Sequence, residues 1–300
     1  MEPDNATRQH RWSLVYGLMA VFLWSTMATA FKWSLSYTSP LQLIAMASVV
    51  SWLFFLVALG ITGELKILKS TPPGEIARSL LFGLLNPGIY YLVLFEAYDR
   101  LPAQDAMAIN YTWGLTLPLI SALFTRQWPS GRALALALLS YLGILVIATD
   151  GQLIALEFQY PMGVGLALVS TLLWGLAWSL NSLQKLEAIP ALFLNFTAAM
   201  PVLWVAMWLD GSMTSLTWQS LIAGVYVGLF EMGIAFLLWL SALRMTKNTL
   251  KLSSLIFLAP VISLFLIATV LRETISIATL IGLGLILIGF SAQQMRSDTN

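Results

Sequence analysis

Glu231 lies inside a long apolar stretch, thirteen residues from both Trp218 and Arg244. If that stretch is a membrane-spanning helix, a rise of about 1.5 Å per residue places the carboxyl group about 20 Å from either end. An ionised group at that depth is costly unless it faces a cavity or a partner. Three roles are open: a protonated group hydrogen-bonded to a neighbouring helix, a proton-coupling site, and a site that holds a substrate ammonium group.

A second polar interruption of an apolar stretch is Asn86-Pro87-Gly88, within the segment GLLNPGIYYLVLFEA. Pro87 removes a backbone donor and frees the carbonyl of Gly83, while Gly88 permits a close approach. Such breaks are tolerated in membrane helices where neighbouring helices or cavity water satisfy the freed group. A packing kink and a carbonyl that binds a ligand are both open.

Aromatic residues gather at similar depths in several apolar stretches. Tryptophan usually concentrates at membrane interfaces, and that pattern fits Trp12, Trp52, Trp128, Trp208 and Trp218. A tyrosine hydroxyl or indole N–H at mid-bilayer needs a partner, which a wet cavity supplies. The sequence therefore predicts a substrate-binding cavity lined by Glu231, Asn86 and the central aromatics Trp24, Tyr90, Tyr91, Tyr111, Trp113, Trp174 and Trp178.

Two further charged residues are expected at the membrane surface. Lys32 follows Trp12 by about 30 Å of helix, so its side chain can snorkel to the interface. Glu96 precedes Arg100 by one helical turn, which favours a peripheral ion pair at the outer rim of the path.

Pro118 and Pro260 occupy matched places in two spans and are candidate hinges, although static kinks explain them almost as well.

Membrane helices are the elements that must position these residues. The chain has 300 residues, of which 59% are hydrophobic and only 10% charged, whereas about a quarter of a soluble domain is charged. Apolar runs of about 20 residues, long enough to cross the bilayer, recur throughout. We predict an all-α membrane protein with ten transmembrane helices at 12–35, 40–61, 77–98, 103–125, 131–149, 161–183, 190–209, 218–243, 249–270 and 275–294.

Charge placement predicts the orientation, because lysine and arginine mark cytoplasmic loops. With both termini in the cytoplasm, only three basic residues lie outside, namely Lys32, Arg100 and Arg272. The other twelve are Arg8, Arg11, Lys66, Lys69, Arg78, Arg126, Arg132, Lys185, Arg244, Lys247, Lys251 and Arg296.

The two halves of the chain are weakly alike. GLLNPGIYYLVLFEA aligns without gaps to GLFEMGIAFLLWLSA from Gly228, and PLIS at Pro118 matches PVIS at Pro260. The predicted domains are five-helix repeats at 12–149 and 161–294. Because five is odd, the second repeat enters the membrane from the opposite side, as in secondary transporters that hold substrate between inverted repeats.

These features resemble a known family. Two five-helix halves, the proline-containing fourth and ninth spans, and the stretch LSALRMTKNTLKLSSLIFLAPVISLFLIATVLRE are similar to EamA-type repeats of the drug/metabolite transporter superfamily. Within that superfamily, the aromatic-rich spans look like bacterial amino-acid exporters of the YddG type. The resemblance implies a ten-helix, basket-like bundle in the inner membrane. The first half departs from the pattern, since Gln127-Trp128 stand where the family often has a glutamate comparable to Glu273.

Other classes of protein are disfavoured. Intramembrane catalysis needs a nucleophile with a base, a metal site or paired acids. The only histidine, His10, precedes the first span, cysteine is absent, and no second acid stands near Glu231. We expect that the protein is not an enzyme and that it binds no cofactor and no metal ion. The net charge of +1 gives no indication of nucleic acid binding. A phosphate-bearing substrate would need a cation in the cavity, and no lysine or arginine reaches the middle of a span.

The sequence therefore predicts a secondary transporter that exports neutral, mainly aromatic amino acids across the bacterial inner membrane by alternating access. The alternative is proton-coupled export of lipophilic cations or other metabolites, with Glu231 as the counter-charge. Expected partners are the small-molecule substrate and membrane lipids, and a monomer is expected.

Overall fold

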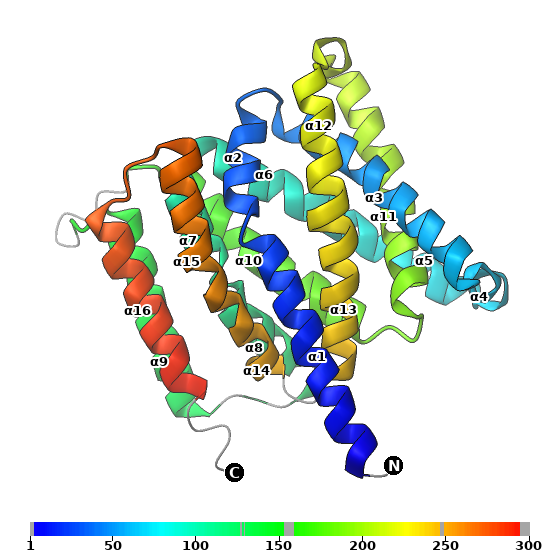
Figure 1. Ribbon diagram of the computed structural model, residues 1–300, viewed down its shortest axis with the longest axis horizontal. Helices are drawn as coiled ribbons and strands as arrows, with labels where there is room; N and C mark the ends of the chain where they lie inside the picture. Colours follow the sequence, from blue (N-terminus) through cyan, green and yellow to red (C-terminus); the bar gives the residue numbers. More distant parts are fainter. Residues whose placement is uncertain (1–2, 127, 129, 153–158, 247–248, 295–300) are drawn as a thin grey trace.

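The computed structural model describes residues 3–126, 128, 130–152, 159–246 and 249–294. In this part of the chain every regular element is a helix (Figure 1). Up to residue 148 the elements are α1 (Pro3–Trp24), α2 (Met27–Leu35), α3 (Pro40–Thr62), α4 (Leu65–Ser70), α5 (Pro73–Gly83), the π-helical η1 (Leu84–Ile89), α6 (Tyr90–Arg100), α7 (Ala103–Asn110), α8 (Trp113–Thr125) and α9 (Gly131–Ala148).

The later elements begin at residue 161. They are α10 (Pro161–Ser182), α11 (Ala188–Leu209), the 3₁₀ turn η2 (Ser212–Ser215), α12 (Trp218–Tyr226), the π-helical η3 (Val227–Ile234), α13 (Ala235–Met245), α14 (Thr249–Ser253), the 3₁₀ turn η4 (Ser254–Leu258), α15 (Ala259–Leu266), the π-helical η5 (Ile267–Leu271) and α16 (Ile277–Gln294).

Length and hydropathy identify this chain as a multi-pass membrane protein. In the described residues, seven helical segments are long and apolar enough to cross a bilayer: Arg11–Leu35, Pro40–Thr62, Pro73–Arg100, Ala103–Thr125, Pro161–Ser182, Ala188–Leu209 and Trp218–Met245. Two shorter apolar helices are Ile262–Leu271 and Ile277–Gly289. The helical membrane class is confirmed, while the count of ten spans stays a prediction.

Local sequence sets the start of two of these helices. Ser39 accepts a hydrogen bond from the Gln42 amide, and the Gln42 side chain accepts one from the Ser39 amide, which forms a capping box at the start of α3. Pro40 at the first helical position needs no hydrogen-bond donor. Thr217 and Ser220 form the same reciprocal pair at the start of α12.

Asn86 and Glu231 both lie in π-helical segments, η1 and η3 respectively. At Asn86 the backbone leaves the helical region, with φ −144° and ψ 116°. The interruption predicted at Asn86-Pro87-Gly88 is therefore present. Single π-helical turns inside longer helices occur frequently at functional sites.

Packing between the earlier and later elements is reciprocal. Helix α1 packs on α13 while α10 packs on α6, and α3 packs on α12 and η3 while α11 packs on α5 and η1. A glycine permits the close approach in both the α11 contact and the α3 contact. A Cβ atom at Gly83 would collide with the Asn195 backbone of α11, and a Cβ atom at Gly228 would collide with the Ala47 carbonyl of α3. Helices α9 and α16 lie side by side (Figure 1).

Candidate functional site

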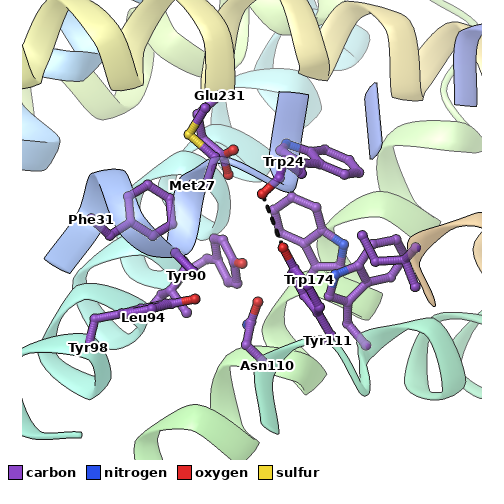
Figure 2. A pocket seen from close by; sticks show the side chains of 13 residues that line it. Trp24, Met27, Phe31, Tyr90, Leu94, Tyr98, Asn110, Tyr111, Trp174 and Glu231 are labelled. Atoms are coloured by element: carbon purple, nitrogen blue, oxygen red, sulfur yellow. Dashed lines mark hydrogen bonds between the residues drawn. The ribbon is translucent and has the colours of Figure 1, made fainter. Parts of the chain in front are cut away.

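A small cavity lies where α1, α2, α6, α7, α8, α10, η3 and η4 meet (Figure 2). Its volume is about 20 Å³, which is room for about one water molecule. Six of the predicted site residues line it: Trp24, Tyr90, Tyr111, Trp113, Trp174 and Glu231. The remaining lining comes from Met27, Ala28, Phe31, Leu94, Tyr98, Asn110 and Ile256.

Four tryptophans pack together beside the cavity. The Trp24 ring lies 5.4 Å from Trp174, 5.9 Å from Trp113 and 5.2 Å from Trp239, measured between centroids. Trp113 and Trp239 are 5.2 Å apart in an edge-to-face arrangement. Tilted and edge-to-face pairs at these distances are favourable beyond simple burial. The cluster therefore forms one continuous aromatic wall contributed by four different helices.

The buried carboxyl group of Glu231 is held by a tyrosine from another helix. The Tyr91 hydroxyl donates to Glu231 Oε1 over 2.6 Å. Glu231 Oε2 is buried and accepts no hydrogen bond from the described residues. One oxygen is therefore fixed in position, and the other is left for a donor that none of the described residues supplies.

Tyr111 ties the start of α8 to the end of α1. Its hydroxyl donates to the Trp24 carbonyl over 3.1 Å (Figure 2) and lies 3.3 Å from Ser263 Oγ. Ser263 in turn donates to the Ser25 carbonyl over 2.7 Å. Because α1 ends at Trp24 and α2 starts at Met27, these two bonds use carbonyl groups at the break between the two helices.

Several buried donors near the cavity have no acceptor in the described part of the chain. They are the indole N–H groups of Trp24, Trp174, Trp178 and Trp239. A buried polar group without a partner carries a desolvation cost on the order of 1–3 kcal/mol. Together with Glu231 Oε2, they give the aromatic cluster both unmatched donors and an unmatched acceptor.

Three predicted site residues lie behind the lining. Tyr91 reaches the cavity only through Glu231. Trp178 packs against Trp174 and Phe236, with centroid distances of 5.4 and 4.9 Å. Asn86 is buried, and its Oδ1 has no partner among the described residues. None of the three is part of the inner surface of the cavity.

The proposed hinge prolines differ in their surroundings. Pro118 lies inside α8, where it interrupts the hydrogen-bond pattern of a continuous helix. Pro260 lies in the first turn of α15, directly after η4, where a proline is readily accommodated. Neither residue lines the cavity.

Four charged residues, Lys32, Glu96, Arg100 and Glu273, do not line the cavity. Glu96 and Arg100 form the expected ion pair, with 2.8 Å between Oε2 and Nη2. The Lys32 ammonium donates to the carbonyl groups of Tyr98 and Leu101, over 2.8 and 2.7 Å, so it binds the carboxyl end of α6. Glu273 accepts a hydrogen bond from the Ala103 amide at the start of α7. Its suggested counterpart Gln127 lies outside the described residues.

Sequence reasoning missed part of the lining. Met27 and Phe31 follow Trp24 by three and seven residues, a spacing that places them on one helical face. Asn110 is a polar residue inside an apolar span and donates to Ser170 Oγ over 2.9 Å. Both signals were available in the sequence. Figure 2 shows Asn110 pointing toward Tyr90 and Tyr111.

The described residues contain no group of three or more acidic, histidine or cysteine side chains that could hold a metal ion. The cavity lining carries one ionisable acid, Glu231, and no lysine or arginine. Its chemistry is therefore that of an aromatic, hydrogen-bonding site.

Comparisons with known proteins match most of the chain. A model described as "EamA-like transporter family" matches residues 11–149 and 161–292. A protein of Archaeoglobus fulgidus named "Uncharacterized transporter" is 22% identical over 274 residues, covering 90% of this chain and 94% of its own. "Protein PecM" of Dickeya dadantii is 25% identical over 222 residues, and the match covers 71% of this chain and 72% of the length of PecM.

Solved structures with a similar fold include one described as "Crystal structure of protein". The TM-score is 0.70 with 22% sequence identity, and the match covers 96% of this chain and 99% of the other.

Proposed function

The chain belongs to the EamA-like transporter family of the drug/metabolite transporter superfamily, and we propose that it exports neutral, mainly aromatic amino acids across the bacterial inner membrane. The transport function and the membrane setting follow from the family and the apolar helices. The substrate class is the proposal, and it is supported by the composition of the cavity.

One observation carries this proposal: the aromatic cavity combines an unmatched acceptor with unmatched donors. Glu231 Oε2 can accept from a substrate ammonium group, and the buried indole N–H groups of the lining residues Trp24 and Trp174 can donate to a substrate carboxylate. The Trp24–Trp174 wall suits an aromatic ring. A zwitterion with an aromatic side chain satisfies all three features.

The cavity lies between the two segments that the family model matches separately. Trp24, Tyr90 and Tyr111 come from residues 11–149, while Trp174 and Glu231 come from residues 161–292. We infer two five-helix halves of inverted topology, at 12–149 and 161–294, that hold substrate where they meet. The reciprocal packing of α1 on α13 and of α10 on α6 supports this arrangement.

Transport by alternating access requires the cavity to open, because about 20 Å³ holds no amino acid. Pro118 and Pro260 are the proposed hinges. The proposed orientation places both termini in the cytoplasm. In support, the first turn of α1 and the last turn of α16 lie at the same side of the bundle (Figure 1), and twelve of fifteen basic residues fall on that predicted side.

A second candidate is export of lipophilic cations. Glu231 is an acid in a lining that has no basic side chain, and aromatic rings attract quaternary ammonium groups. Under this alternative the same carboxylate is the counter-charge of the ligand and its site of proton coupling.

Equilibrium binding to the purified protein separates the two candidates. Radiolabelled tryptophan and a fluorescent quaternary ammonium dye are titrated against the wild-type chain and Trp174→Ala. We expect saturable tryptophan binding that is weakened several-fold by Trp174→Ala. Binding of the dye without binding of tryptophan would favour the cation exporter.

A further inference from the structure

The short helix α2 has a cavity on each of two faces. Met27, Ala28 and Phe31 line the central cavity. The residues Thr29, Ala30, Trp33 and Ser34, with Thr26 just before the helix, line a separate groove. The groove residues follow the pattern i, i+3, i+4, i+7, i+8, and the central-cavity residues follow i, i+1, i+4, so each set occupies one face of a helix. A single helix is therefore the wall between the two spaces.

The groove lies between α2, α12 and η5, and η5 directly continues α15. Its far walls are formed by Ile222, Ala223 and Tyr226 on one side and by Leu266 and Val270 on the other. The groove volume is about 410 Å³, against about 20 Å³ for the central cavity. Pockets of roughly 300–1,000 Å³ are the usual size for small-molecule sites.

Hydroxyl groups stand among the apolar walls of this groove. Thr26 Oγ1 and Tyr226 Oη lie 2.9 Å apart and join α12 to the break between α1 and α2. Thr29 is only 8% exposed, and its Oγ1 has no hydrogen-bond partner among the described residues. The Oγ1 atom is itself buried, so a ligand must reorient the Thr29 side chain to pair with it, and that pairing would remove the cost of an unpartnered hydroxyl.

Charge and exposure restrict what the groove can hold. None of its lining residues is acidic or basic, so an ionic ligand would lie unpaired at membrane depth. Ile222 and Val270 are 50% and 57% exposed, which opens the groove toward the surrounding lipid. An acyl chain would fill the volume but would leave the Thr29 hydroxyl without a partner.

We propose that this groove is a second binding site, for neutral amphiphilic molecules with an apolar ring or chain and one hydrogen-bonding group. The occupant enters from the membrane, packs between Trp33 and Val270, and pairs its polar group with Thr29 or with the Thr26–Tyr226 hydroxyls. The site is separate from the central cavity, and its occupancy does not depend on which substrate the central cavity takes.

Photolabelling of the purified full chain in lipid nanodiscs tests this site. The probe is a benzyl alcohol that carries a trifluoromethyl diazirine, which is neutral, aromatic and bears one hydroxyl. We expect saturable labelling of the peptides that contain Thr29 and Tyr226, with competition by unlabelled benzyl alcohol. Thr29→Val should weaken binding and so raise the half-saturation concentration about fivefold. Ala30→Trp, which fills the groove, should abolish saturable labelling.

Matched controls come from the same region. Ala268 and Thr269 lie on η5, are exposed and do not line the groove, so Ala268→Trp and Thr269→Val should label like the wild type. Val270→Trp at the exposed rim replaces Ala30→Trp if that variant fails to fold. Labelling that rises linearly with probe and is unchanged by Ala30→Trp or Val270→Trp would overturn the proposal, because the groove would then hold only acyl chains.

Discussion

The hydroxyl of Tyr91 donates to Glu231 Oε1 over 2.6 Å, and this bond joins two segments of the chain that are matched separately by the same family model. Tyr91 lies in α6 and Glu231 in η3. The bond fixes the carboxyl group at the central cavity and leaves its second oxygen unmatched. Among the described residues, Tyr91 is the side chain that holds the acid by a hydrogen bond.

Replacing Glu231 by glutamine distinguishes its possible roles. Glutamine keeps an oxygen for the Tyr91 hydroxyl, and a zwitterion can be held by neutral dipoles. We expect amino-acid efflux from liposomes without a pH gradient to fall by no more than about fivefold, the value of one neutral hydrogen bond. The control is Tyr141→Phe in α9, a side chain that does not line the cavity, and this variant should transport like the wild type. A folded Glu231→Gln variant that transports nothing would make the carboxylate essential to the mechanism.

The aromatic wall predicts a clear difference between central and peripheral residues. Trp113→Ala, Trp174→Ala and Tyr111→Ala each remove one ring from the cavity lining, at a cost on the order of 1 kcal/mol in substrate affinity. Trp128 and Trp208 are 64% and 67% exposed, so the same change there should leave transport near the wild-type level. Equal losses in both groups, at equal expression, would mean that the rings only stabilise the fold.

Sequence spacing predicted that these residues share a depth, but it could not predict which way each side chain faces around its helix axis. Asn86 and Tyr90 are four residues apart and would share a face in a regular α-helix. The π-helical turn and the extended backbone at Asn86 change that relationship, so Tyr90 lines the cavity and Asn86 does not. Trp178 does share a face with Trp174, but Trp174 lies between it and the cavity.

The break between α1 and α2 was also outside the reach of sequence reasoning. Serine and threonine occur commonly within membrane helices, so Ser25 and Thr26 gave no signal. In the structure their hydroxyls donate to the carbonyls of Phe22 and Leu23, over 2.6 and 2.8 Å. The apolar runs themselves predicted the helix positions well, because hydropathy depends on composition and not on side-chain direction.

Two glycines should be essential to the packing of the fold. Gly83→Ala and Gly228→Ala each place a methyl group against the backbone of a neighbouring helix. Overpacking of this kind costs about 1–3 kcal/mol, so both variants should unfold at lower temperature in detergent. Gly165→Ala and Gly284→Ala are the controls, because nothing lies within 4 Å of a Cβ atom there. Unchanged stability of Gly83→Ala and Gly228→Ala would contradict the observed helix contacts.

The inverted arrangement predicts the accessibility of two loops. The chain contains no cysteine, so single cysteines at Ser70 and Ser212 report cleanly. Ser70 ends α4 and Ser212 starts η2. A membrane-impermeant maleimide applied to intact cells should label Ser212→Cys and spare Ser70→Cys until the membrane is opened. Labelling of both from outside would contradict the inverted repeat.

Counterflow in proteoliposomes tests the central claim most directly. Vesicles loaded with unlabelled L-tryptophan are diluted into trace radiolabelled L-tryptophan, with wild-type protein, Trp174→Ala or no protein. The account predicts transient accumulation of label by the wild type, competition by L-phenylalanine but not by tetraphenylphosphonium, and a several-fold smaller signal with Trp174→Ala. Counterflow of tetraphenylphosphonium without any counterflow of tryptophan would contradict the claim that this cavity carries neutral aromatic amino acids.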